Sequence, residues 1–159
     1  MKTFPRGLAG LYEFVPYSLP ALLARVVVGL IFFRSGLTKI DLTTLAVKPA
    51  TFFLFDHEYK FRLFQYFGLS ANDYAFPATH LLAYAATTIE LLMPLALWLG
   101  LGTRFAASAL LAQTAVIATV YPDAYMDHAL WAIGLLMLMR FGPGPLSLDH
   151  FARKLGRTP

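Results

Sequence analysis

Long apolar runs separated by short polar segments dominate the chain, and their lengths predict membrane-spanning helices. Three runs, at residues 20–40, 77–101 and 103–120, approach the roughly 20 residues that a helix needs to cross about 30 Å of hydrocarbon. A fourth apolar run is shorter, so we extend it back to an N-cap at Asp123 and predict a span over residues 123–141. The pattern therefore predicts an all-α fold, a polytopic membrane four-helix bundle.

Turn-forming residues mark the ends of these predicted helices. Gly100 and Gly102 end the second helix, and Thr103 is placed to cap the third. The run GPGP that begins at Gly142 stops the fourth helix and leaves a tail over residues 142–159. Because the loop between the second and third helices is very short, we expect these two to be antiparallel neighbours.

The connection over residues 43–76 mixes aromatic side chains with charges, which is typical of a segment at a membrane interface. Its larger apolar side chains recur at helical spacing on one face, at Phe52, Phe55, Tyr59, Leu63 and Tyr66. Polar side chains recur on the opposite face, at Glu58, Arg62 and Gln65. We therefore expect a short amphipathic helix in this aromatic outer loop, lying over the outer end of the bundle.

The composition agrees with lipid as the solvent. Hydrophobic residues make up 58% of the chain and charged residues only 14%, too few to cover a water-soluble globule of this size. The net charge of +4 does not indicate nucleic acid, because the basic residues are scattered at the ends of the apolar runs. With no cysteine, any redox role needs a bound cofactor or another subunit. We expect a single domain over residues 1–159.

The distribution of basic residues predicts an orientation in the membrane. Four spans put both termini on one side, together with Lys2, Arg6, Arg104, Arg140, Arg153, Lys154 and Arg157. On the other side the basic residues are diluted by acidic ones. The positive-inside rule then predicts a multi-pass protein of the bacterial inner (plasma) membrane with both termini in the cytoplasm.

Ionisable residues inside the predicted spans are the candidates for chemistry, because charges in a bilayer are costly and usually face the bundle interior. By depth, Glu90 lies between Arg25 and Arg34. One carboxylate between two guanidiniums leaves a positive charge for an anionic ligand, a deprotonated cofactor group or water to balance. The alternative is a structural ion pair that locks two helices together. Arg25 and Arg34 are nine residues apart, on opposite helix faces, so at most one is a tight partner.

Two further polar residues are placed near Glu90. Gln113 lies at nearly the same depth on the third helix, and Thr87 lies one turn from Glu90 on the same face. They predict a small polar pocket at mid-membrane, with plain interhelical hydrogen bonding as the alternative. Gly29 and Gly36, seven residues apart on one face, predict a close-packing seam between helices.

Three histidines fall on the predicted outer side, at His57, His80 and His128, with Asp127 beside the last. Imidazoles with carboxylates are candidates for a copper or zinc site, or for a proton relay to a quinone. Their spacing matches no metal-binding motif, and lone interfacial histidines are the alternative.

Three stretches together resemble the DoxX family of membrane proteins: RVVVGLIFFRSGLTKI, IELLMPLALWLGLGTR and GPGPLSLDHF. They look closest to the branch encoded beside iron enzymes that modify copper-binding peptides. The resemblance implies a four-helix membrane bundle and an association with redox or oxidative-stress complexes, since the family name derives from a thiosulfate:quinone oxidoreductase. It also implies motif positions at Arg25, Gly29, Gly36, Glu90, Gly142, Gly144 and Asp149.

Two functional hypotheses follow. In the first, the protein is a redox-associated membrane subunit linked to quinone or haem, and an enzyme only as a subunit of a quinone-linked oxidoreductase. In the second, it is a non-catalytic membrane partner for a protein or a metal-binding peptide, including copper handling or a copper stress response. Both include the lipid bilayer and another protein subunit as partners, with a homo-oligomer as a further option and no nucleic acid.

Overall fold

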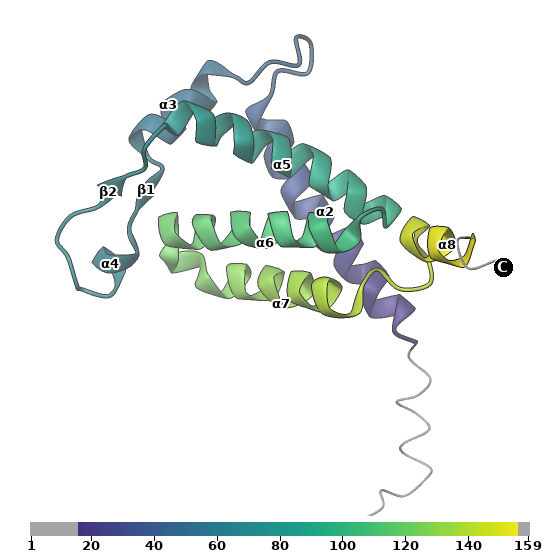
Figure 1. The fold of residues 1–159 in the computed structure, drawn as a ribbon. Helices are drawn as coiled ribbons and strands as arrows, with labels where there is room; N and C mark the ends of the chain where they lie inside the picture. The colour runs from purple at the N-terminus through teal and green to yellow at the C-terminus, as the bar shows by residue number, and fades with distance from the viewer. Residues whose placement is uncertain (1–15, 156–159) are drawn as a thin grey trace, which may run out of the picture.

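The structure is a computed structural model, and it describes residues 16–155. Its elements in chain order are α2 (Ser18–Lys39), α3 (Pro49–His57), β1 (Lys60–Phe61), α4 (Leu63–Tyr66), β2 (Tyr74–Ala75), α5 (Thr79–Leu99), α6 (Thr103–Val120), the 3₁₀ helix η1 (Pro122–Ala124), α7 (Tyr125–Phe141) and α8 (Leu148–Leu155) (Figure 1). The protein is therefore mostly helical, in agreement with the predicted class.

Three helices are long and apolar enough to cross a membrane: α2, α5 and α6. Their bounds lie within two residues of the predicted spans. The fourth predicted span corresponds to α7, which has 17 residues. Asp123 is not its N-cap, because this residue lies within η1 and α7 begins after Ala124.

The four long helices pack against one another. Helix α2 contacts α5 and α7, while α6 contacts α5 and α7. Large side chains such as Phe32, Leu110 and Leu135 are fully buried between them. Figure 1 shows α3, α4 and the two strands at one end of these helices, the α3 end, and α8 at the other, the α8 end.

Two glycines bring α2 close to α5. A Cβ atom at Gly36 would lie 3.1 Å from the Cβ of Glu90, and one at Gly29 would collide with the indole of Trp98. Both glycines are buried. Small residues at such positions let helix backbones approach closely, which is how apolar helices gain packing energy in lipid.

The outer loop differs from the single amphipathic helix that we expected. Helix α3 ends at His57, and α4 follows only after β1, which pairs antiparallel with β2. The backbone N–H of Arg62 also donates to the carbonyl of Thr119 at the end of α6, with an N to O distance of 2.8 Å. These contacts join residues far apart in sequence, and the helical spacing of the side chains carries no information about them.

At the α8 end, hydrogen bonds join the beginning of α6 to α8. Gly100 and Gly102 have φ values of 67° and 55°, a conformation that glycine adopts without strain, and they turn the chain from α5 into α6. The side chain of Thr103 does not cap α6. Instead the carboxylate of Asp149 accepts hydrogen bonds from the backbone N–H groups of Gly102 (2.8 Å) and Thr103 (2.9 Å).

Candidate functional site

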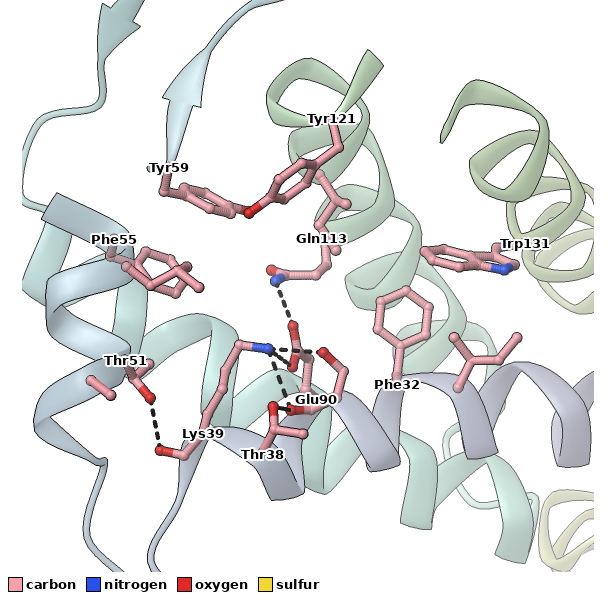
Figure 2. Close-up of a pocket in the computed structure, with 15 residues that line it drawn as sticks. Phe32, Thr38, Lys39, Thr51, Phe55, Tyr59, Glu90, Gln113, Tyr121 and Trp131 are labelled. Atoms are coloured by element: carbon pink, nitrogen blue, oxygen red, sulfur yellow. Dashed lines mark hydrogen bonds and ion pairs between the residues drawn. The ribbon is translucent and has the colours of Figure 1, made fainter. Parts of the chain in front are cut away.

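A cavity of about 410 Å³ lies at the α3 end of the long helices (Figure 2). Its polar lining consists of Ser35, Thr38, Lys39, Thr51, Tyr59, Glu90, Gln113 and Tyr121. Its aromatic lining includes Phe32, Phe55 and Trp131. We call this cavity the Glu90 pocket. Its size and its mostly apolar lining with a few convergent polar groups are typical of sites that bind small molecules.

A buried ion pair forms the floor of the Glu90 pocket. The Nζ of Lys39 lies 2.5 Å from Oε2 of Glu90, whose side chain is only 2% exposed. The same Nζ contacts the hydroxyl of Ser35 at 2.9 Å, and the amide of Gln113 donates to Oε1 of Glu90 at 3.2 Å. Both carboxylate oxygens therefore have partners, and Lys39 balances the charge of Glu90.

The helical face of α2 determines which cation meets Glu90. Gly36 lies directly against Glu90, and Lys39 is one turn further along the same face. Arg34 is two positions before Gly36, on the opposite side, and its side chain is exposed. The cation that pairs with Glu90 is therefore Lys39, and neither Arg25 nor Arg34, the two candidates that depth in the membrane indicated.

The hydroxyl group of Tyr59 is buried in the pocket without a hydrogen-bond partner among residues 16–155. Tyr59 is only 5% exposed, and its ring stacks on Phe55 at a centroid distance of 4.3 Å. Burial raises the pKa of Tyr59 well above its ordinary value, so the hydroxyl keeps its proton. Figure 2 shows Tyr59 and Tyr121 together, across the pocket from Lys39. Tyr59 is thus a buried donor without a partner in the lining of the Glu90 pocket.

Arg25 lies at the other end of α2, away from this pocket. Its guanidinium donates to the carbonyls of Leu97 (2.6 Å), Trp98 (2.7 Å), Pro143 (3.1 Å) and Leu146 (2.6 Å). The side chain is only 2% exposed. It joins the C-terminal end of α5, where carbonyls lack helical partners, to the loop that follows α7. Arg25 therefore acts as a structural anchor of the α8 end.

Of the polar residues predicted near Glu90, the structure brings only Gln113 to it. Thr87 is buried one turn away, but its hydroxyl donates to the carbonyl of Ala83 in its own helix, and Thr87 does not line the pocket. Arg25 and Arg34 lie elsewhere.

The histidines do not assemble into one site. His57 lies near the carbonyl of Phe53, and His80 lies 3.2 Å from a carboxylate oxygen of Asp56. His128 is buried on α7 with its ring against Trp131, whereas Asp127 is exposed. Within residues 16–155, no group of three or more acidic or histidine side chains is placed to hold a metal ion.

The DoxX family model matches residues 21–122. The chain belongs to the DoxX family. Neither the curated proteins nor the solved structures include a significant match to it. The DoxX match covers Lys39, Tyr59, Glu90 and Gln113, so it contains most of the pocket, while Trp131 and α8 lie outside it.

Proposed function

We propose that this DoxX protein is a membrane subunit of a redox complex, and that the Glu90 pocket binds the head ring of a quinone. The observation that carries the proposal is the unpartnered hydroxyl of Tyr59 in a cavity of about 410 Å³ with aromatic walls. A buried hydroxyl without a partner costs about 1–3 kcal/mol, and a ligand with an acceptor atom relieves that cost.

The chemistry of the lining fits a flat ring with carbonyl oxygens at opposite edges. Phe32, Phe55 and Trp131 offer apolar contact to the ring faces. Tyr59 is a hydrogen-bond donor on one side, and the Lys39 ammonium with the Gln113 amide supplies donors on the other. A quinone carries electrons when bound, and because the chain has no cysteine the electrons come from another subunit or from a further bound cofactor. The residues of this chain hold and orient the ring.

The proposal includes the membrane arrangement. Helix α7 serves as the fourth span, because its 17 residues extend about 26 Å and η1 continues it at one end. The α8 end then faces the cytoplasm, since its exposed basic residues outnumber its acidic ones. The Glu90 pocket lies toward the outer face of a bacterial inner membrane.

Fluorescence quenching tests this function, because the chain has only two tryptophans and Trp131 alone lines the pocket. In a Trp98→Phe background, a short-chain 1,4-benzoquinone is expected to quench Trp131 saturably. Tyr59→Phe removes one hydroxyl and keeps the ring, so it is expected to weaken binding about 3- to 10-fold, the value of one hydrogen bond.

The matched control is Tyr66→Phe, an exposed tyrosine of the same loop that does not line the pocket. It is expected to leave quenching unchanged. Quenching that does not saturate, or equal affinities for Tyr59→Phe and the parent protein, would rule out the proposal. A Soret band in the purified protein would instead point to haem.

A second function, as a non-catalytic partner for a protein or a metal-loaded peptide, is supported by a separate observation. The outer loop exposes large apolar side chains, at Phe53, Phe64, Tyr66, Phe67 and Leu69. Exposed aromatic clusters of this kind often mark contact surfaces. Under this reading, Phe64→Ser with Phe67→Ser abolishes assembly with the partner, and Tyr59→Phe does not. A role in copper handling is tested by titrating copper ions into the parent protein and into a variant in which His57 and His80 are replaced.

A further inference from the structure

A second cavity, of about 340 Å³, lies at the α8 end of the molecule, far along the long helices from the Glu90 pocket. The beginning of α6 forms one wall with Arg104 and Phe105, and α8 forms another with Asp149 and Arg153. Pro143, in the loop between α7 and α8, completes it. We call it the arginine cavity.

The charges in the arginine cavity are unbalanced. Among its described lining residues Asp149 is the one carboxylate, and it accepts hydrogen bonds from the backbone N–H groups of Gly102 and Thr103, so one negative charge meets two guanidinium groups. In the part of the chain that the structure describes, the guanidinium of Arg104 forms no hydrogen bond or ion pair, and Arg153 uses only its Nε, which donates to the backbone carbonyl of Asp149 at 3.1 Å. Two guanidinium groups therefore present free donors to one cavity.

The position of the cavity decides what kind of anion fits. It lies at the beginning of α6, one of the three described helices able to cross a membrane. Phe105, next to Arg104, is 72% exposed, and Phe141 at the end of α7 is 63% exposed. Aromatic and basic residues together at the end of a span are typical of the level of the lipid headgroups.

Helix α8 adds an amphipathic surface beside the cavity. Leu148 and Phe151 are three residues apart on one side of the helix and are exposed, and His150 and Lys154 are on the other side. Such helices are suited to membrane surfaces that carry anionic lipids. The exposed basic residues at this end, Arg104, Arg140, Arg153 and Lys154, complement a negatively charged leaflet.

We propose that the arginine cavity binds the phosphate of an anionic phospholipid in the adjacent leaflet. Arg104 and Arg153 hold the phosphate oxygens, for which the planar guanidinium is well matched. Phe105 and Pro143 contact the apolar part of the lipid below the headgroup. The apolar walls and the place at the end of a span favour a lipid over free phosphate.

Thermal unfolding in a neutral detergent tests this proposal with lipid as the probe. Phosphatidylglycerol is expected to raise the Tm in a saturable way, and phosphatidylcholine is not. Arg104→Gln and Arg153→Gln are each expected to weaken the apparent phosphatidylglycerol affinity at least 5-fold, and the double variant to abolish the Tm shift.

The matched control is the double variant Arg140→Gln with Lys154→Gln, which removes the same charge from the same end but not from the cavity. It is expected to keep the Tm shift. An equal loss in this control would overturn the proposal in favour of general surface attraction. A Tm shift of the same size with inorganic phosphate or glycerol phosphate would overturn the assignment to a lipid.

Two further measurements keep the result interpretable. Arg104→Lys and Arg153→Lys preserve the charge and lose the paired donors, so they are expected to show intermediate affinity even if a glutamine variant folds poorly. Benzoquinone quenching at Trp131 is expected to be unchanged in all these variants, because the Glu90 pocket is at the other end. Failure of lipid binding is therefore distinguishable from failure of the quinone proposal.

Discussion

At the scale of single residues, the main feature is the ion pair that Glu90 forms with Lys39. Both groups are removed from bulk water, since the side chain of Glu90 is 2% exposed and that of Lys39 is 17% exposed. The desolvation cost of such a pair roughly offsets its attraction, but removal of one partner leaves an unbalanced buried charge. The pair therefore acts mainly by fixing α2 against α5 and by placing an ammonium group at the pocket floor.

Removal of the Lys39 ammonium group is expected to lower the stability of the protein. We expect Lys39→Met to destabilise the protein by about 3–5 kcal/mol, because Glu90 loses its cation, and the double variant with Glu90→Leu to recover much of this loss. Equilibrium unfolding in mixed micelles measures both. Arg34→Met, on the exposed side of the same helix, is the control and is expected to cost little. If Arg34→Met lowers the free energy of unfolding as much as Lys39→Met does, Lys39 is not the cation that balances Glu90.

The sequence predicted part of this site for a clear physical reason. The depth of a residue along a helix follows from the rise per residue, so Glu90 and Gln113 were placed at one level, and they are hydrogen-bonded. The partner cation was missed because depth says nothing about the helix face, whereas the spacing of Gly36 and Lys39 does. The role of Tyr59 depends on the end of α3 and on β1, which the sequence pattern did not predict.

At the scale of elements, the beginning of α6 depends on a residue of α8. Asp149 supplies both acceptors for Gly102 and Thr103, so the two helices are joined by a charged cap. The GPGP run, predicted as a helix stop, performs a second task because the carbonyls of Pro143 and Leu146 bind Arg25. Composition predicted that α7 ends there, but not that the loop returns to α2 and α5.

Because the carboxylate of Asp149 caps α6, we expect its contribution to the stability of the protein to depend on pH. Burial raises the pKa of Asp149, but the hydrogen bonds from Thr103 and Gly102 and the charge of Arg153 together lower it by more, so its pKa is below the ordinary value of 3.8. The stabilisation that the carboxylate contributes is therefore full above about pH 4 and is lost as the pH falls through the lowered pKa.

We expect Asp149→Asn to cost about 1–2 kcal/mol at neutral pH, and the difference from the parent protein to shrink below about pH 4. Thermal unfolding across pH 3–7 measures this difference as a shift in Tm. Asp127→Asn, an exposed acid in the first turn of α7, is the control. A constant Tm difference down to pH 3 contradicts an ionised cap.

At the scale of the whole molecule, the two ends have different chemistry. The α3 end holds the Glu90 pocket beneath aromatic residues, and the α8 end holds Arg25 and the arginine cavity. The hydroxyl of Tyr17 donates to the carbonyl of Gly142 at 2.7 Å, so the beginning of α2 and the end of α7 lie at the same end. This agrees with the proposed membrane arrangement, in which four crossings place the α8 end in the cytoplasm.

Labelling of single cysteines tests the orientation, because the chain has none of its own. A membrane-impermeant maleimide is expected to label Leu69→Cys, at an exposed position of the outer loop, in spheroplasts. It is expected to label His150→Cys, on the exposed side of α8, only after lysis. Labelling of both positions, or of His150→Cys alone, before lysis contradicts the orientation.

The distance in sequence between Asp149 and its partners has a consequence for biogenesis. The three helices that qualify as spans leave the ribosome before residues 143–149, which supply partners to Arg25, Gly102 and Thr103. Until then the guanidinium lacks two of its four acceptors and α6 begins without its cap. The α8 end is therefore completed only after the three spans have been synthesised. A chain that stops at Phe141 would contain the three spans, but Arg25 would lack two of its acceptors and α6 would begin without its cap.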